Sequence, residues 1–226
     1  MLAWSRPDPQ RLLRAAAELV LTGHEVALEY APARGDDADA ELTDLVARAH
    51  AAGLADACEI TVPVGRLGAV AAGRLAGAAT DAGMTVAFSG PAGQADALAA
   101  ALPGAGVVVH SGAPGAVLRC SRLDAPRVRL TEDRGTSAAL SFVRCLNALM
   151  ARSAQLGIAA VDPRLIAITG ERAAWHSRTP DSWEYVMPHG VRTEEQQRLM
   201  AAGHRVRVAL STRGGSPVRR VLAGLS

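Results

Sequence analysis

Short apolar runs alternate with longer segments of helical periodicity along this chain. The runs are rich in β-branched residues, as buried parallel strands are. The segments between them repeat apolar residues at spacings of three and four, as helices do. The predicted strands are His24–Ala31, Cys58–Val64, Met84–Ser89, Gly106–His110, Arg127–Thr131, Gly157–Val161, Trp183–Met187 and Arg205–Leu210. Helices are predicted at Ala38–Ala52, Ala69–Ala82, Ser137–Arg152 and Thr193–Ala202.

Strand–helix alternation predicts an α/β fold with parallel pairing and right-handed crossovers. Eight such units can close into a (β/α)8 TIM-type barrel, which we predict as a single domain over residues 1–226. The segment Met1–Gly23 is predicted to be a lead-in helix that caps the barrel floor. The competing arrangement is an open doubly wound sheet. It loses support because the first strand-to-helix turn, "EYAPARGDDA", holds one glycine and no nucleotide-binding GxGxxG motif.

Composition narrows the function classes. The formal net charge is +2, from 24 basic and 22 acidic residues, and no basic run is interleaved with aromatic residues, so nucleic acid is not an expected partner. Every basic residue is arginine, which excludes a lysine Schiff base or a lysine base. The scattered Cys58, Cys120 and Cys145 are predicted to be reduced, buried thiols. Neither a signal peptide nor a transmembrane segment is predicted, and we expect a cytoplasmic protein.

Three blocks in the second half of the chain resemble the proline dehydrogenase family. They are "RVRL" followed by "SFVRCLNALM", then "GIAAVDPRLIAITGERAAW", then "SWEYVMPHGVRTEEQQRLMAAGHRVRVALS", and their order and spacing match the family. In the first half, "CEITVPVGRLG" is similar in a weaker way. The resemblance implies a barrel that binds FAD noncovalently and oxidises L-proline to 1-pyrroline-5-carboxylate, with quinone as electron acceptor. Its active-site groups would lie at the carboxyl ends of the strands.

The resemblance also assigns roles to four residues. Arg129 matches the arginine that lies against the flavin ring, and Glu184 matches the family's glutamate on the seventh strand. Arg219 and Arg220 match the paired arginines that clamp the substrate carboxylate. Two guanidinium forks suit a carboxylate bidentately.

Other strand-end positions depart from the family. Glu132 replaces the flavin-binding lysine, which is a full reversal of charge. Polar or aromatic family residues are also replaced at several further positions, namely Pro63, Ser89, His110, Ala160, Val161, His189 and Ala209. Each lost charge-assisted hydrogen bond costs about 1.5–3 kcal/mol, so these losses together are enough to abolish tight flavin binding.

Three hypotheses about function follow. In the first, the chain is a degenerate proline dehydrogenase homologue that binds a small carboxylate, an amino acid or a partner protein and carries little or no flavin chemistry. In the second, it is an active FAD-dependent oxidoreductase of proline or a related imino acid. In the third, it is a flavin-free enzyme that uses His110, His189 and Glu184 at the barrel mouth. FAD is therefore the cofactor only if the second hypothesis holds.

The candidate residues also have plainer interpretations. In one interpretation, His110 and His189, near Glu29 at the strand ends, form a new site for an anion or a metal. In the other, they are polar side chains without a function at a solvent-filled barrel mouth. No HxH or HExxH spacing supports a metal, and none is predicted. A further hypothesis is that Arg129 and Glu184 form an internal ion pair instead of binding a cofactor. His110 and Glu184 could also form an acid–base pair. Arg219 and Arg220 are alternatively a surface pair, and the apolar helix at Ala69–Ala82 packs on the barrel or on a partner subunit.

Overall fold

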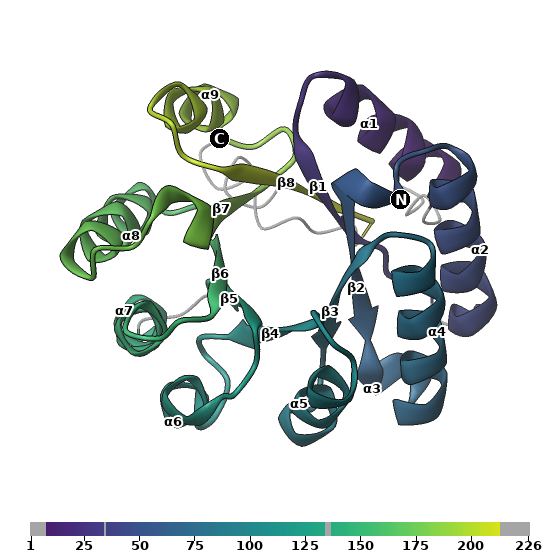
Figure 1. Ribbon diagram of the computed structural model, residues 1–226, viewed down its shortest axis with the longest axis horizontal. Coiled ribbons are helices and arrows are strands. Elements are labelled where there is room, and N and C mark those ends of the chain that lie inside the picture. Colours follow the sequence, from purple (N-terminus) through teal and green to yellow (C-terminus); the bar gives the residue numbers. More distant parts are fainter. Residues whose placement is uncertain (1–7, 34, 134–136, 213–226) are drawn as a thin grey trace, which may run out of the picture.

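A closed parallel barrel organises the chain in the computed structural model, which describes residues 8–33, 35–133 and 137–212. Each strand pairs in parallel with the next in sequence, and β8 pairs with β1 to close the ring (Figure 1). The strands are β1 (Glu25–Glu29), β2 (Cys58–Pro63), β3 (Thr85–Ser89), β4 (Gly106–His110), β5 (Arg127–Thr131), β6 (Gln155–Ala159), β7 (Trp183–Pro188) and β8 (Val206–Ser211). The predicted (β/α)8 barrel is confirmed.

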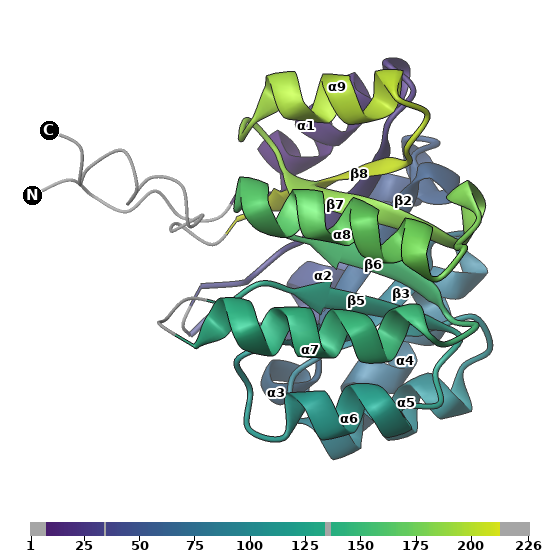
Figure 2. The same ribbon diagram turned by 90° about the vertical axis from the view of Figure 1, so that its left-hand side faces the viewer.

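A ring of helices surrounds the strands (Figures 1 and 2). The helices are α1 (Pro9–Leu21), α2 (Ala38–Ala51), α3 (Val64–Leu67), α4 (Ala69–Asp81), α5 (Ala92–Ala101), α6 (Ala116–Arg122), α7 (Ala138–Met150), α8 (Pro163–Trp175) and α9 (Thr193–Ala201). Aspartate is the N-cap residue of three of these helices. The side chains of Asp8, Asp37 and Asp162 accept hydrogen bonds from the first free backbone N–H groups of α1, α2 and α8. Among the described residues, no helix has the length and apolar character needed to span a membrane.

The position of α1 corrects one prediction. We predicted a helix that caps the barrel floor, but α1 packs on the outside of β1 and β8, between α9 and α2 in the ring (Figure 1). Its buried residues include Leu12 and Ala16, which lie on one face and join the main hydrophobic core. The helix is amphipathic, so its apolar face needs a sheet surface to cover, and the outer face of β1 and β8 provides one.

The two faces of the barrel strands differ in character. Outward side chains such as Leu28, Ile60 and Phe88 are fully buried and form the main core with the helices. The apolar cluster inside the barrel is small and is formed by Ala27, Val186 and Ala209, with Ala159 packed against it. Barrel interiors are usually filled by bulky branched residues. The small residues here leave room that long polar side chains fill.

The sixth strand lies two residues earlier than predicted. We placed it at Gly157–Val161, but β6 runs from Gln155 to Ala159, so Ala160 and Val161 follow the strand rather than end it. The apolar pattern missed the first two residues, Gln155 and Leu156, because the strand begins with the polar Gln155. Its side chain accepts a hydrogen bond from Arg127 at 3.0 Å, so it belongs to the polar interior.

We predict that Phe142→Ala on α7 lowers the free energy of unfolding by about 3–5 kcal/mol, because Phe142 is fully buried between helix and sheet. Leu140 on the same helix is 56% exposed, so Leu140→Ala is a matched control that changes stability by less than about 0.5 kcal/mol. Urea unfolding followed by circular dichroism measures both. Equal losses in the two variants would contradict the assignment of the core face of α7.

Candidate functional site

Two pairs of arginines project into the barrel. Arg127 and Arg129 are two residues apart on β5, and Arg205 and Arg207 are two residues apart at β8. Because side chains alternate between the faces of a strand, each pair lies on one face. Facing them are carboxylates from other strands. The result is two groups, each with two arginines and two glutamates, which we call the β5 quartet (Arg127, Arg129, Glu29, Glu59) and the β8 quartet (Arg205, Arg207, Glu25, Glu184).

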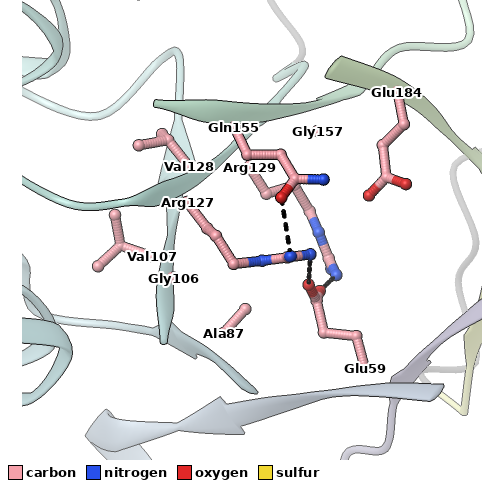
Figure 3. A pocket seen from close by; sticks show the side chains of 10 residues that line it. All are labelled: Glu59, Ala87, Gly106, Val107, Arg127, Val128, Arg129, Gln155, Gly157 and Glu184. Atoms are coloured by element: carbon pink, nitrogen blue, oxygen red, sulfur yellow. Dashed lines mark hydrogen bonds and ion pairs between the residues drawn. The ribbon is translucent and has the colours of Figure 1, made fainter. Parts of the chain in front are cut away.

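In the β5 quartet, Arg129 lies between two carboxylates. Its Nη1 donates to Glu29 Oε1 at 2.9 Å and to Thr61 Oγ1 at 3.2 Å, while its Nη2 forms an ion pair with Glu59. Arg127 Nη2 lies 3.5 Å from Glu59 Oε2 (Figure 3). Burial lowers the pKa of the Arg129 guanidinium, and Glu29 partly offsets this effect. The chain therefore supplies the counter-charge that this buried cation requires.

The β8 quartet repeats this arrangement at β7, β8 and β1. Arg207 Nε donates to Glu184 Oε1 at 2.8 Å, and Arg207 also pairs with Glu25. Arg205 Nη2 lies 2.7 Å from Glu25 Oε1 and 3.6 Å from Glu184 Oε2. Burial raises the pKa of Glu25, but Arg207 and Arg205 outweigh it, so the pKa lies below the ordinary value of 4.5.

The hypothesis that Arg129 and Glu184 form an ion pair is wrong. In the described part of the chain each is paired within its own quartet, and Figure 3 shows Glu184 apart from the Arg129–Glu59 contact. Glu184 is also the second residue of β7, so it lies near the amino end of that strand, not at the mouth where we expected it. Our pairing of Glu184 with His110 fails for the same reason.

Glycines make room for the arginines. A Cβ on Gly157 would lie 3.1 Å from Val186 and 3.6 Å from Cγ of Arg129, and a Cβ on Gly106 would lie 2.9 Å from Cβ of Arg127. Between the quartets a cavity of about 10 Å³ remains, which is room for about one water molecule. Among the described residues, this part of the interior is therefore filled by the chain's own side chains and leaves no room for a substrate.

At the mouth, His110 pairs with a residue that the sequence analysis missed. His110 Nδ1 lies 3.5 Å from Asp133 Oδ1, and the other carboxylate oxygen of Asp133 accepts the Gly112 N–H at 2.8 Å. Asp133 N–H donates to the buried Ser111 hydroxyl at 3.3 Å. His110 pairs in register with Thr131, so Asp133, two residues further, was the residue to consider. A half-exposed imidazole beside a held carboxylate can accept or donate a proton.

His189 is not part of this pair. It is the exposed residue after β7, and its backbone N–H donates to Ala209 O at 2.9 Å. Nothing in the described ranges brings three histidine, cysteine, aspartate or glutamate side chains together as metal ligands, so the suggested site of two histidines and a glutamate is not formed there. Arg219 and Arg220 lie outside the described residues.

Glu132, at the position of the family's flavin-binding lysine, binds the chain's own backbone. Its Oε2 accepts the N–H of Val161 at 2.7 Å and of Asp162 at 3.2 Å, directly before α8. Backbone N–H groups at the start of a helix are typical anion-binding groups. Here a carboxylate of the chain occupies them.

No sequence-family profile and no curated protein matches the chain. Solved structures do match. Proline utilization A from Bdellovibrio bacteriovorus, inactivated by N-propargylglycine, superposes with a TM-score of 0.80 at 11% identity over 97% of this chain and 32% of that one. A proline utilization A variant from Bradyrhizobium japonicum gives 0.66 at 17% identity, over 89% and 27%. The citrate synthase SbnG gives 0.51 at 13% identity, over 97% and 88%.

The chain thus has a proline dehydrogenase-like barrel fold. It spans a third or less of the length of the proline utilization A chains that it matches. At these identities the similarity shows the fold alone, and the sequence resemblance is supported at that level.

Arg129 and Glu132 do not fit the flavin contacts that the resemblance implies for their positions. Arg129, expected against the flavin ring, is 5% exposed and holds two glutamates and a threonine. Glu132 is negative where the family has a lysine, and it fills two backbone donors that an anionic ligand would use. Neither group presents a free positive charge at the mouth.

We predict that Arg129→Met lowers the free energy of unfolding by about 3–5 kcal/mol, because it leaves the buried Glu59 with only the longer 3.5 Å contact to Arg127. Adding Glu59→Gln to that variant should recover at least about half of the loss, since the buried charge is then removed. Arg198→Met is the matched control, because the Arg198–Glu195 pair on α9 is exposed at the arginine, and it should cost less than about 1 kcal/mol. A double variant no more stable than Arg129→Met in chemical unfolding would refute the pairing.

Proposed function

We propose that this chain is a flavin-independent, degenerate relative of the proline dehydrogenase barrels whose mouth binds a small carboxylate. The observation that carries the proposal is the pairing of Arg129 with Glu29 and Glu59. The charges of Arg129 and the neighbouring Arg127 are already balanced by Glu29 and Glu59, so this group presents no net charge that would attract a flavin. To recruit it, a flavin would have to break contacts that are already made.

Glu132 supports the same proposal independently. A flavin phosphate near the Val161 and Asp162 amides would meet a carboxylate at the distance of a hydrogen bond. Like charges so close repel, and the lost amide hydrogen bonds would add to the cost. Flavin binding thus meets obstacles at two separate places in the mouth.

A small carboxylate is the ligand class that the remaining chemistry favours. Its counter-charge is Arg129, reached past the partly exposed Glu29. The His110 ring lies at the mouth as a further polar group. The matching structures belong to proteins named for the use of proline and the synthesis of citrate, and both compounds are small carboxylic acids.

One observation favours a flavin-free enzyme as a second candidate. His110 Nδ1 lies 3.5 Å from a carboxylate oxygen of Asp133, whose orientation is fixed by Gly112 and Ser111, and a histidine beside an oriented carboxylate is typical of a general acid or base. If a bound acid is converted, His110 is the group that moves the proton. A His110→Gln variant with undiminished turnover would exclude this role.

The active FAD-dependent proline oxidoreductase is the remaining alternative, and the barrel fold is what favours it. It would need cofactor contacts other than those of Arg129 and Glu132. Glu184 would not supply one from the described geometry, because it lies at the other end of the barrel interior, paired with Arg207.

We predict that the purified protein, incubated with excess FAD and desalted, retains no flavin absorbance and melts at the same temperature with and without FAD. Both results follow from the pairing of Arg129 with Glu29 and Glu59 and from the occupation of the Val161 and Asp162 amides by Glu132. Retained stoichiometric flavin would overturn the proposal. Loss of that flavin in Arg129→Ala would then restore the role that the family resemblance assigns to Arg129.

A further inference from the structure

The two carboxylates that hold Arg129 are not equivalent. Glu59 is the second residue of β2 and is 7% exposed, so it lies deep in the barrel. Glu29 is the last residue of β1, pairs in register with Ser211 and is 37% exposed. Arg129 itself is 5% exposed. Glu29 therefore covers Arg129 on the side of the mouth, and it is the partner that solvent reaches.

Charge balance in the β5 quartet depends on this outer carboxylate. With Glu29 in place, two arginines face two glutamates, and an incoming anion finds no net positive charge. Without it, Arg127 and Arg129 face only Glu59. The guanidinium of Arg129 would then keep its buried partner and present one uncompensated charge towards the mouth.

We propose that Glu29 is a built-in, displaceable carboxylate, and that the carboxylate of a small ligand takes its place on Arg129 and the Thr61 hydroxyl. This inference rests on the proposed function, since it identifies where the small carboxylate binds. The exchange replaces like with like, because Nη1 of Arg129 keeps a carboxylate acceptor and the Thr61 hydroxyl can donate its proton to the new carboxylate. The displaced Glu29 returns to water at the mouth.

Competition from Glu29 sets how strongly the site binds a free carboxylate. A tethered carboxylate competes at a high effective concentration, so a free carboxylate binds the unchanged protein weakly. Glu29 thus tunes the affinity of the site, and a ligand that also contacts other mouth groups displaces it more readily than acetate does. The same competition keeps Arg129 paired when no ligand is bound.

The test is the affinity of the full chain for acetate, measured by titration of ¹³C-acetate in NMR. We expect Glu29→Ala to bind acetate at least about tenfold more tightly than the unchanged protein, because the competitor is gone and a charge-assisted hydrogen bond becomes available. Neutral acetamide should show no such gain. Glu195→Ala, which removes a carboxylate from α9 that pairs with Arg198, is the matched control and should leave acetate binding unchanged.

A second variant locates the gain. Arg129→Met with Glu59→Gln removes one positive and one negative charge together, so the net charge of the β5 quartet does not change, and in the Glu29→Ala background it should abolish the gain. The inference is overturned if Glu29→Ala shows no gain, if Glu195→Ala gains as much, or if the gain survives the loss of Arg129. These results concern acetate alone, so they are distinguishable from failure of the proposed function, which retained flavin would reveal.

Discussion

The structure depends on the burial of arginine inside a closed barrel. A guanidinium such as that of Arg129, 5% exposed, is tolerated only with counter-charges and hydrogen-bond acceptors around it. The chain supplies Glu29 from β1, Thr61 and Glu59 from β2, and solves the same problem for Arg207 with Glu25 and Glu184. Strands that are not neighbours in the sheet are thereby joined across the interior.

This requirement also accounts for the small residues of the interior. Gly157 and Gly106 stand beside the arginines because a larger side chain would meet them, and Ala27 and Ala209 replace the branched residues that usually fill a barrel. The same fold can serve many functions, since function lies in the site and not in the barrel. Here the arginines and glutamates of the interior form ion pairs with one another. That is the physical difference between this barrel and one built to hold an anionic cofactor.

Much of the fold could be predicted from the sequence. The bounds of β4 and β5 are those predicted, because runs such as "GVVVH" and "RVRLT" are short, apolar or alternating, and clearly bounded. The polar Gln155 hid the start of β6. The place of α1 was missed, because an amphipathic pattern reveals an apolar face without revealing which part of the barrel it covers.

The site was less predictable. The alternation in "RVRL" places Arg127 and Arg129 on one face, but it does not name Glu59 as their partner, which comes from a strand that β5 does not touch in the sheet. The contact of His110 with Asp133 depends on the register of β4 with β5 and on the loop after β5, and neither is written in a single sequence.

The most direct test of the central claim is to follow the arginine side-chain signals of ¹⁵N-labelled protein by NMR while FAD is added. If the interior arginines are held by the chain's own carboxylates, the Arg129 Nη–H and Arg207 Nε–H signals will exchange slowly with water and will not move with FAD. An Arg129 signal that exchanges rapidly, or that shifts in proportion to added FAD, would contradict the account.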